Sequence, residues 1–509
     1  MAAYLLLRGS ALFLVGAFND DGAYVMLGKS IAEGTGYHLT YLVGSPVAVK
    51  YPPGLPALLA IPWALGGTLT AVRATVGILN PLACGAAAAV IWWIGRRDLA
   101  LAPAPLAVAA IGPFLLDHAI QYSAIPLAEP YFLLGWAVAV ALAATVTRPP
   151  GALALGLVLA LATLFRSAGV ALVPACLAAL ALRRVPWRVV AICAAAATGP
   201  LIVWGVVHGR MVAAGPLSSS PDEVSYWSLI PFGPVQLPVY LVHALWNNSR
   251  RYVSEFSAVL AGPVVVGYAL VLAALGTAAV GAVRSWRRAP AVALTAATAL
   301  AVVLVWPFAQ DRLLLPLIPF LGLLSAVAID EGAKRLPERW RLAAPLGLAL
   351  TALIVGLRQV ELRSIAAAAF VQGQQPAPRD ASIFLTLAKN SRHIATVSEW
   401  ARTNTSPQDR LLVDFPAGTR LYSGRLTAPA SPAEAGYAPS VFEHPGRYLT
   451  ARILDDSITV IALGIRGPIL RDVETVSRTC PAVLRRALSF AEVYHVIRDD
   501  ICLRSLTVP

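Results

Sequence analysis

Two adjacent carboxylates, Asp20 and Asp21, follow the first apolar stretch of the chain and open a polar loop from Asn19 to Tyr51. A carboxylate at the edge of an apolar segment can take a proton from a substrate hydroxyl or bind a metal ion. The pair could instead cap a helix and interact with its dipole, and spacing alone leaves both interpretations open.

Other charged side chains stand nearly alone in apolar surroundings. Lys50 closes the same loop, Glu129 opens an apolar segment, Arg166 lies between two such segments, and Asp311 and Arg312 separate another two. An ionisable residue at such a position is a functional candidate by default. The basic residues could bind a phosphate. A lone Lys or Arg could equally extend to solvent or to lipid headgroups.

The composition identifies the environment in which these residues must work. The 509 residues are 58% hydrophobic and only 13% charged, with a mean hydropathy of +0.68, which is too apolar for a soluble protein of this size. The net charge of +13 does not indicate nucleic-acid binding, because most basic residues cluster between apolar runs, as orientation signals do. Glycine-rich phosphate loops, paired-histidine metal motifs and GxSxG elbows are absent from the sequence, so it does not support a nucleotide-dependent enzyme or a zinc protease.

The apolar runs predict a polytopic α-helical membrane protein with about eleven spans. Basic residues follow every second span, so the positive-inside rule places the N-terminus in the cytoplasm and everything after about residue 358 on the outer side. The pair at 152–182 is the weakest part, because each member is shorter than about 20 residues. The expected spans are 4–18, 71–95, 99–116, 127–146, 152–165, 169–182, 189–207, 258–283, 292–308, 313–329 and 342–357.

The chain is therefore expected to have two domains joined by a linker. Residues 1–358 form the transmembrane domain, in which 208–257 is an outer loop and 21–34 an amphipathic helix lying at the outer membrane surface. Residues 359–389 form the linker. Residues 390–509 alternate helical and strand patterns and predict a small extracytoplasmic α/β domain. Cys480 and Cys502 are its only cysteines and are candidates for a disulfide.

The polar residues of the first loop carry a resemblance to a known family. Its three segments resemble the first outer loop of the GT-C superfamily of polyprenyl-phosphate-sugar-dependent glycosyltransferases, which includes protein O-mannosyltransferases and lipid A aminoarabinose transferases. The matching segments are Asp20-Asp21-x-x-Tyr24, Ala32-Glu33-Gly34-x-Gly36-Tyr37 and Lys50-Tyr51-Pro52-Pro53-Gly54. Weaker similarity extends to Pro126-x-x-Glu129-Pro130, Phe165-Arg166 and Asp311-Arg312-x-x-x-Pro316.

The resemblance implies a role for each of these residues. Asp20 would be the general base or the acid that orients the acceptor, Asp21 would support it, and Glu129 would be the second acid of the cavity. The donor phosphate would bind Lys50, Arg166 and Arg312, and the substrate cavity would include Tyr24, Tyr51 and Asp311.

The same resemblance implies the reaction and its setting. The donor would be a sugar on a polyprenyl phosphate, the acceptor a glycan, lipid or protein, and transfer would invert the anomeric centre. The location would be the bacterial cytoplasmic membrane. Some members bind a divalent metal ion, so the metal is a candidate cofactor here with no ligands assigned.

Two other classes of protein fit parts of the sequence. A lipid or solute transporter would also have many spans with few buried charges, but the sequence shows no internal repeat and its charges gather at one face. A structural assembly subunit would leave Asp20 and Glu129 without a role.

Overall fold

The computed structural model describes residues 13–115, 123–215, 230, 231, 233–261, 264–307, 311–335, 337, 347, 383–430, 447–463, 469–488, 492–497 and 500–505. All but residue 347 of the predicted span at 342–357 and most of the predicted linker at 359–389 fall outside these residues. So does most of the first predicted span, of which only 13–18 is described, as a turn-rich segment.

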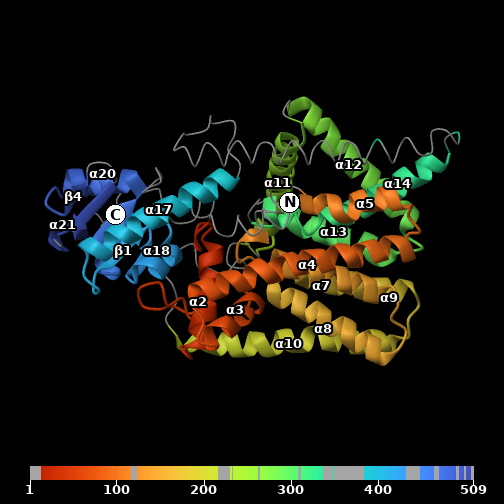
Figure 1. Ribbon diagram of the computed structural model, residues 1–509, viewed down its shortest axis with the longest axis horizontal. Helices are drawn as coiled ribbons and strands as arrows, with labels where there is room; N and C mark the ends of the chain where they lie inside the picture. The colour runs from red at the N-terminus through yellow and green to blue at the C-terminus, as the bar shows by residue number, and fades with distance from the viewer. Residues whose placement is uncertain are drawn as a thin grey trace.

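Most helices of the helical part, such as α4, α7, α8 and α10, run side by side along the long axis of the molecule, whereas α11 and α12 run at an angle to it (Figure 1). The bounds of α4 follow from its sequence: it begins after Thr68, whose hydroxyl accepts a hydrogen bond from the Ala71 amide, and it ends with Arg96 and Arg97 in its last turn. The elements are α3 (Gly54–Ala64), α4 (Leu69–Arg97), α5 (Pro103–Ile111), η1 (Gly112–Leu115), α7 (Glu129–Ala143), α8 (Pro149–Phe165), η2 (Ser167–Ala171), α9 (Leu172–Leu182), α10 (Trp187–Ala214), α11 (Gln236–Ala261), α12 (Val264–Ser285), α13 (Pro290–Val305), η5 (Asp311–Leu313) and α14 (Ile318–Lys334).

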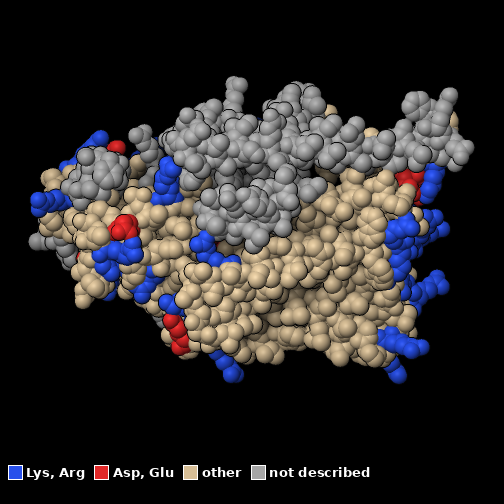
Figure 2. Space-filling view, in the orientation of Figure 1, with Lys and Arg blue, Asp and Glu red and all other residues tan. Residues whose placement is uncertain are grey.

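Several of these helices have a length and composition suited to crossing a membrane. Among the described residues, Leu69–Arg97, Trp187–Ala214 and Tyr268–Ser285 are long and apolar enough to cross one, and six further apolar helices are shorter. Figure 2 shows a broad band free of charged side chains, with Lys and Arg gathered at the end of the helical part farthest from the C-terminal part. We call that end the basic end. The chain is thus a mostly helical protein with several apolar helices.

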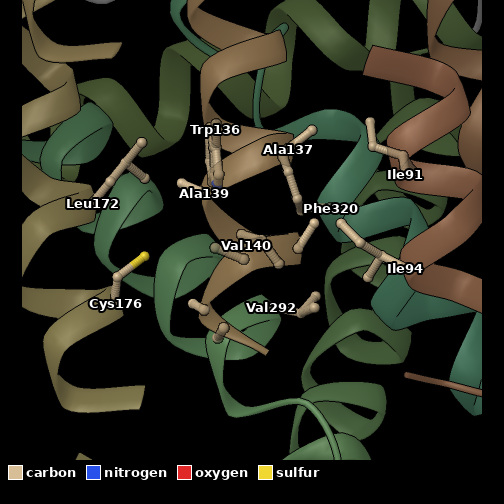
Figure 3. Packing of buried hydrophobic residues seen from close by; sticks show 14 of the residues in the cluster. Ile91, Ile94, Trp136, Ala137, Ala139, Val140, Leu172, Cys176, Val292 and Phe320 are labelled. Atoms are coloured by element: carbon tan, nitrogen blue, oxygen red, sulfur yellow. The ribbon is translucent and has the colours of Figure 1, made fainter. Parts of the chain in front are cut away.

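The centre of the helical part is a close-packed apolar core (Figure 3). The Trp136 indole of α7 stacks on the Phe320 ring of α14, with the ring centroids 4.5 Å apart, and Ile91 and Ile94 of α4 pack beside them. Small residues such as Ala137 let the neighbouring helices approach closely. This core fixes α7 and α14 relative to each other. It therefore also fixes the relative positions of Glu129, which begins α7, and Arg312, which precedes α14.

The first loop contains a helix, α2 (Asp20–Ala32), close to the predicted bounds. The prediction that it is amphipathic is wrong, because most of its side chains are buried within the protein. Its place at the outer membrane surface stays a prediction. It packs against α3, and Gly28 makes this possible, since a Cβ there would lie 2.9 Å from Leu59 Cβ. The helical spacing of Ala23, Leu27 and Ile31 predicted one buried face, but residues between them, such as Val25 and Met26, are buried as well.

The stretch 208–257, predicted as an outer loop, is largely helical. α10 continues to Ala214, and α11 occupies Gln236–Ala261. The sequence of α11 mixes apolar, amide and basic residues, and it is therefore too polar to be recognised as a span. The polar side chains have a local purpose: Asn248 donates to the carbonyls of Leu304 and Trp306 at 2.9 and 2.8 Å, and Tyr240 donates to that of Val305 at 2.9 Å. α11 therefore satisfies the unpaired carbonyls at the end of α13.

The C-terminal part contains a five-stranded sheet of order β2-β1-β3-β5-β4. β1 pairs in parallel with β2 and β3, whereas β5 pairs antiparallel with β3 and β4. A disulfide joins Cys480 and Cys502, with their Cα atoms 5.9 Å apart. The elements are α17 (Ile383–Asn404), β1 (Arg410–Val413), α18 (Pro416–Ser423), β2 (Leu426–Pro429), α19 (Arg447–Asp455), β3 (Val460–Leu463), α20 (Ile469–Thr479), β4 (Leu484–Leu488), β5 (Glu492–Val496) and α21 (Asp500–Ser505).

Hydrogen bonds join this C-terminal part to the segment 13–18, which leads into α2. The Leu14 amide donates to Ser391 Oγ at 2.9 Å and the Val15 amide donates to Tyr422 Oη at 3.1 Å. Farther along the first loop, Thr427 donates twice to the carbonyl of Tyr41. The two parts thus meet at the loop that carries the acidic pair.

The tightest contact in this junction predicts a large effect of one methyl group. Gly16 has φ +96°, and a Cβ there would lie 2.4 Å from the Gly418 Cα, which is backbone and cannot rotate away. We expect Gly16→Ala to destabilise the protein by about 3 kcal/mol or more, through backbone strain and overpacking together. Thermal unfolding in detergent measures it.

Gly34→Ala is the matched control for this substitution. Gly34 also has a positive φ, +72°, but a Cβ there would have no atom within 4 Å. The destabilisation by Gly34→Ala should therefore come from backbone strain alone. Equal destabilisation by the two substitutions would show that the contact with Gly418 has no energetic weight.

Candidate active site

Asp20 lies in the first turn of α2 and is held by three side chains. The Tyr51 hydroxyl donates to its Oδ1 at 3.1 Å, and Lys50 Nζ lies 3.5 Å from the same oxygen. The Arg312 guanidinium donates to Oδ2. The Asp20 residue is only 8% exposed. Residues nearly 300 positions apart thus meet on one carboxylate.

The cations around Asp20 determine its protonation. Burial alone would raise the pKa of this carboxyl, but the nearby charges of Lys50 and Arg312 outweigh burial and hold the pKa well below its usual range. Hydrogen bonds from Arg312 and Tyr51 act in the same direction. Asp20 is therefore an ionised hydrogen-bond acceptor throughout the neutral pH range.

Glu129 forms the second carboxylate of the site. It is the first residue of α7, is 5% exposed, and its Oε1 accepts from Arg166, which directly follows α8. Arg312 Nη1 lies 3.8 Å from the same oxygen, so Arg312 bridges Glu129 and Asp20. The five charges form one row that alternates in sign: Lys50, Asp20, Arg312, Glu129, Arg166.

A cavity adjoins this row of charges. Its wall combines charged groups with aromatic rings, and the rings of Tyr24 and Tyr51 meet edge to face with centroids 5.3 Å apart. Burial raises the pKa of the Tyr24 hydroxyl, so it stays protonated and can donate. The residues that line the cavity are Asp20, Tyr24, Lys50, Tyr51, Pro52, Arg166, Ser167, Ala168, Trp306, Arg312 and Leu313.

Some members of this cavity were not predicted. Trp306 and Ser167 line it, yet Trp306 was treated as part of the span 292–308 and Ser167 only as part of the turn between 152–165 and 169–182. An aromatic residue at the end of an apolar run is typical of a membrane interface, and this signal could have singled out Trp306. Asp311 begins η5, but its side chain is outside the described part of the chain.

Asp21 has an environment different from that of Asp20. It is fully buried, and its two oxygens accept from the backbone amides of Gly16 and Phe18 at 2.7 and 3.0 Å. It does not line the cavity that Asp20 lines. The Phe18 ring lies under the Arg312 guanidinium, 4.9 Å from ring centroid to Cζ. Asp21 thus fixes a turn that in turn supports Arg312.

The burial of Asp21 predicts a pH dependence of stability. Burial raises the pKa of the Asp21 carboxyl to about 7, against its hydrogen bonds with the Gly16 and Phe18 amides. The folded state therefore keeps a proton that the unfolded chain has already lost, and stability falls as pH rises from about 4 to about 7. Thermal unfolding across this range should show the slope, and Asp21→Asn should reduce it. An identical slope in the variant would contradict the assignment.

The acidic side chains of the site that the structure describes do not fit a divalent metal ion. Asp20 and the Oε1 of Glu129 are engaged by Lys and Arg, and only Glu129 Oε2 is buried without a hydrogen-bond partner. One oxygen is far fewer than the set that Mg²⁺ or Ca²⁺ requires. Within the part of the chain that the structure describes, no group of three or more His, Cys, Asp or Glu residues could hold a metal ion.

Comparisons with known proteins identify the fold. No protein-family model matches the chain, and no curated protein matches its sequence. The fold matches the crystal structure of ArnT from Cupriavidus metallidurans bound to undecaprenyl phosphate, with a TM-score of 0.57 and 13% identity over 100% of this chain and 98% of that one. The apo structure of the same protein matches with a TM-score of 0.54 and 13% identity, over 96% and 94%. The resemblance predicted from the first loop is thereby confirmed for the fold.

Proposed function

We propose that this protein is an integral membrane glycosyltransferase that moves a sugar from a polyprenyl-phosphate carrier to an acceptor hydroxyl, with inversion at the anomeric centre. The observation that carries the proposal is the buried row of three cations and two carboxylates beside a cavity with aromatic walls. The fold it shares with an ArnT crystallised with undecaprenyl phosphate supports the choice of donor.

The chemistry assigns each residue of the row a task. A hydroxyl is a poor nucleophile at neutral pH, so a carboxylate must accept its proton as the new bond forms, and Asp20 is the base in our proposal. The leaving group is a lipid phosphate, whose growing negative charge Lys50, Arg166 and Arg312 would stabilise. Glu129 would position two of these cations, because it contacts both arginines.

Donor binding would also switch on the base. In the absence of donor, Lys50 and Arg312 hold the pKa of Asp20 low, which makes it a weak proton acceptor. A donor phosphate that draws these two cations toward itself would move their positive charges away from Asp20. The pKa of Asp20 would then rise. The carboxylate would then become an effective base only when the sugar donor is in place.

The proposed setting follows from the distribution of charge. Residues 1–358 would form the transmembrane domain with about eleven spans, residues 359–389 the linker, and residues 390–509 an extracytoplasmic α/β domain. The basic end would face the cytoplasm of a bacterium, which puts the N-terminus inside and the cavity near the outer surface of the inner membrane. The acceptor would be a glycan, a lipid or a protein.

Transfer from a radiolabelled polyprenyl-phosphate sugar in membranes that contain the protein tests this function. We expect label to reach an acceptor only with the lipid-linked donor, and not with the corresponding nucleotide sugar. Identification of the lipid that copurifies with the protein would support the donor class independently. Absence of transfer from every such donor, together with uphill uptake of a solute, would indicate a transporter instead.

A further inference from the structure

A second cavity lies at the basic end, between α12 and α13. The two helices share a short turn, but α12 packs mainly against α11 and α14 and runs at an angle to α13 (Figure 1). The cavity opens between them beside the turn. It is lined by Ala282, Val283, Arg284, Trp286, Arg287, Arg288, Ala293 and Ala297, none of which belongs to the candidate active site.

The charge on this cavity is strongly unbalanced. Arg284 forms an ion pair with Glu331 at 3.1 Å. Arg287 and Arg288 are exposed, and neither forms an ion pair within the described part of the chain. Three arginines thus face one acid, which leaves two positive charges available. Guanidinium groups bind phosphate oxygens through paired hydrogen bonds, so the complementary ligand is a phosphate-bearing anion.

The rest of the wall favours a lipid over a soluble phosphate. Val283 is 78% exposed and Trp286 is 43% exposed, and the side of the cavity formed by α13 consists of the small residues Ala293 and Ala297. Nearer the start of α12, Leu272 and Val280 are also exposed and extend the apolar surface away from the arginines. A tryptophan beside arginines at the end of an apolar helix is typical of the headgroup level of a bilayer.

We propose that this cavity binds one anionic phospholipid. Arg287 and Arg288 contact the phosphodiester, and an acyl chain lies along the apolar surface of α12 that begins at Val283. Basic pockets between transmembrane helices on the cytoplasmic side bind such headgroups in other membrane proteins. The lipid would fill the gap where α12 and α13 diverge. This inference does not depend on the proposed transfer reaction, since the two sites share no residue.

Native mass spectrometry of the detergent-solubilised full chain tests the site. The probes are phosphatidylglycerol, phosphatidylcholine and inorganic phosphate, each titrated separately. We expect phosphatidylglycerol to bind in preference to phosphatidylcholine, and the double substitution Arg287→Gln with Arg288→Gln to weaken it about 25-fold, roughly fivefold for each arginine.

The matched control is Arg148→Gln with Arg188→Gln. These arginines are also exposed and belong to the same predicted basic flanks, but they do not line the cavity. We expect this variant to retain the affinity of the unmodified protein. An equal loss in both variants would show general attraction between charges and overturn the proposal. Competition by inorganic phosphate at the same concentration as the lipid would show a phosphate site and overturn it as well, as would equal binding of phosphatidylcholine.

Discussion

Asp20→Asn is expected to lower the rate of sugar transfer by about 10²-fold to 10⁴-fold, the usual effect of losing a general base. The substitution preserves the size of the side chain and an oxygen that can accept from Tyr51. It removes the negative charge that accepts the proton. The initial rate of label transfer from the polyprenyl-phosphate donor, normalised to the amount of folded protein, measures the effect.

Asp98→Asn is a suitable control for the loss of one carboxylate. Asp98 also pairs with an arginine, Arg97, but it caps the C-terminus of α4 at the basic end. We expect this variant to transfer sugar as fast as the unmodified protein. If the Asp20→Asn variant transferred sugar at the same rate as the unmodified protein, Asp20 would not be the base. The description of the fold would be unaffected.

Arg312→Gln is expected to destabilise the protein by about 3–5 kcal/mol and to abolish transfer. Arg312 is 5% exposed and bridges Asp20 and Glu129, so its loss leaves two buried carboxylates with one fewer cation between them. Arg312→Lys keeps the charge, but a single ammonium cannot reproduce the two-sided contact of a guanidinium, and an intermediate effect follows. Thermal unfolding in detergent separates these effects from activity.

A double-substitution cycle distinguishes this explanation from a simple packing defect. If Arg312 stabilises the fold by compensating Asp20, then Asp20→Asn should partly rescue the stability of Arg312→Gln. Contacting charged residues show coupling energies of about 0.5–3 kcal/mol in such cycles. Destabilisations that simply add would mean that Arg312 acts through packing, for example against the Phe18 ring.

The sequence predicted the features that depend on simple patterns. The apolar runs located most of the helices, and Glu129 and Arg166 lie at helix ends, as expected from their positions between runs. The strand patterns that begin at Arg410 and that span 455–464 contain β1 and β3. Lys50, Arg166 and Arg312, which stood out as isolated charges in apolar surroundings, each form an ion pair, because burial of a charge requires a partner.

The features that depend on tertiary packing could not be predicted in this way. α11 was missed because its polar residues bind backbone carbonyls of α13, which no local pattern reveals. The two acids of the first loop looked equivalent, yet successive helical residues point about 100° apart. Asp20 therefore faces the cations, while Asp21 faces the turn at Gly16 and Phe18. Only the three-dimensional arrangement separates a residue of the cavity from one that supports it.

The alternating row of charges has a consequence for turnover. Three cations and two carboxylates leave one positive charge, which matches the single negative charge of a phosphodiester donor. Transfer of the sugar leaves a phosphomonoester, which carries up to two negative charges at neutral pH. The spent carrier would then be held more tightly than the fresh donor, and its departure would limit the rate, as product release does in many enzymes. Between turnovers, such an enzyme would rest with the carrier lipid still bound.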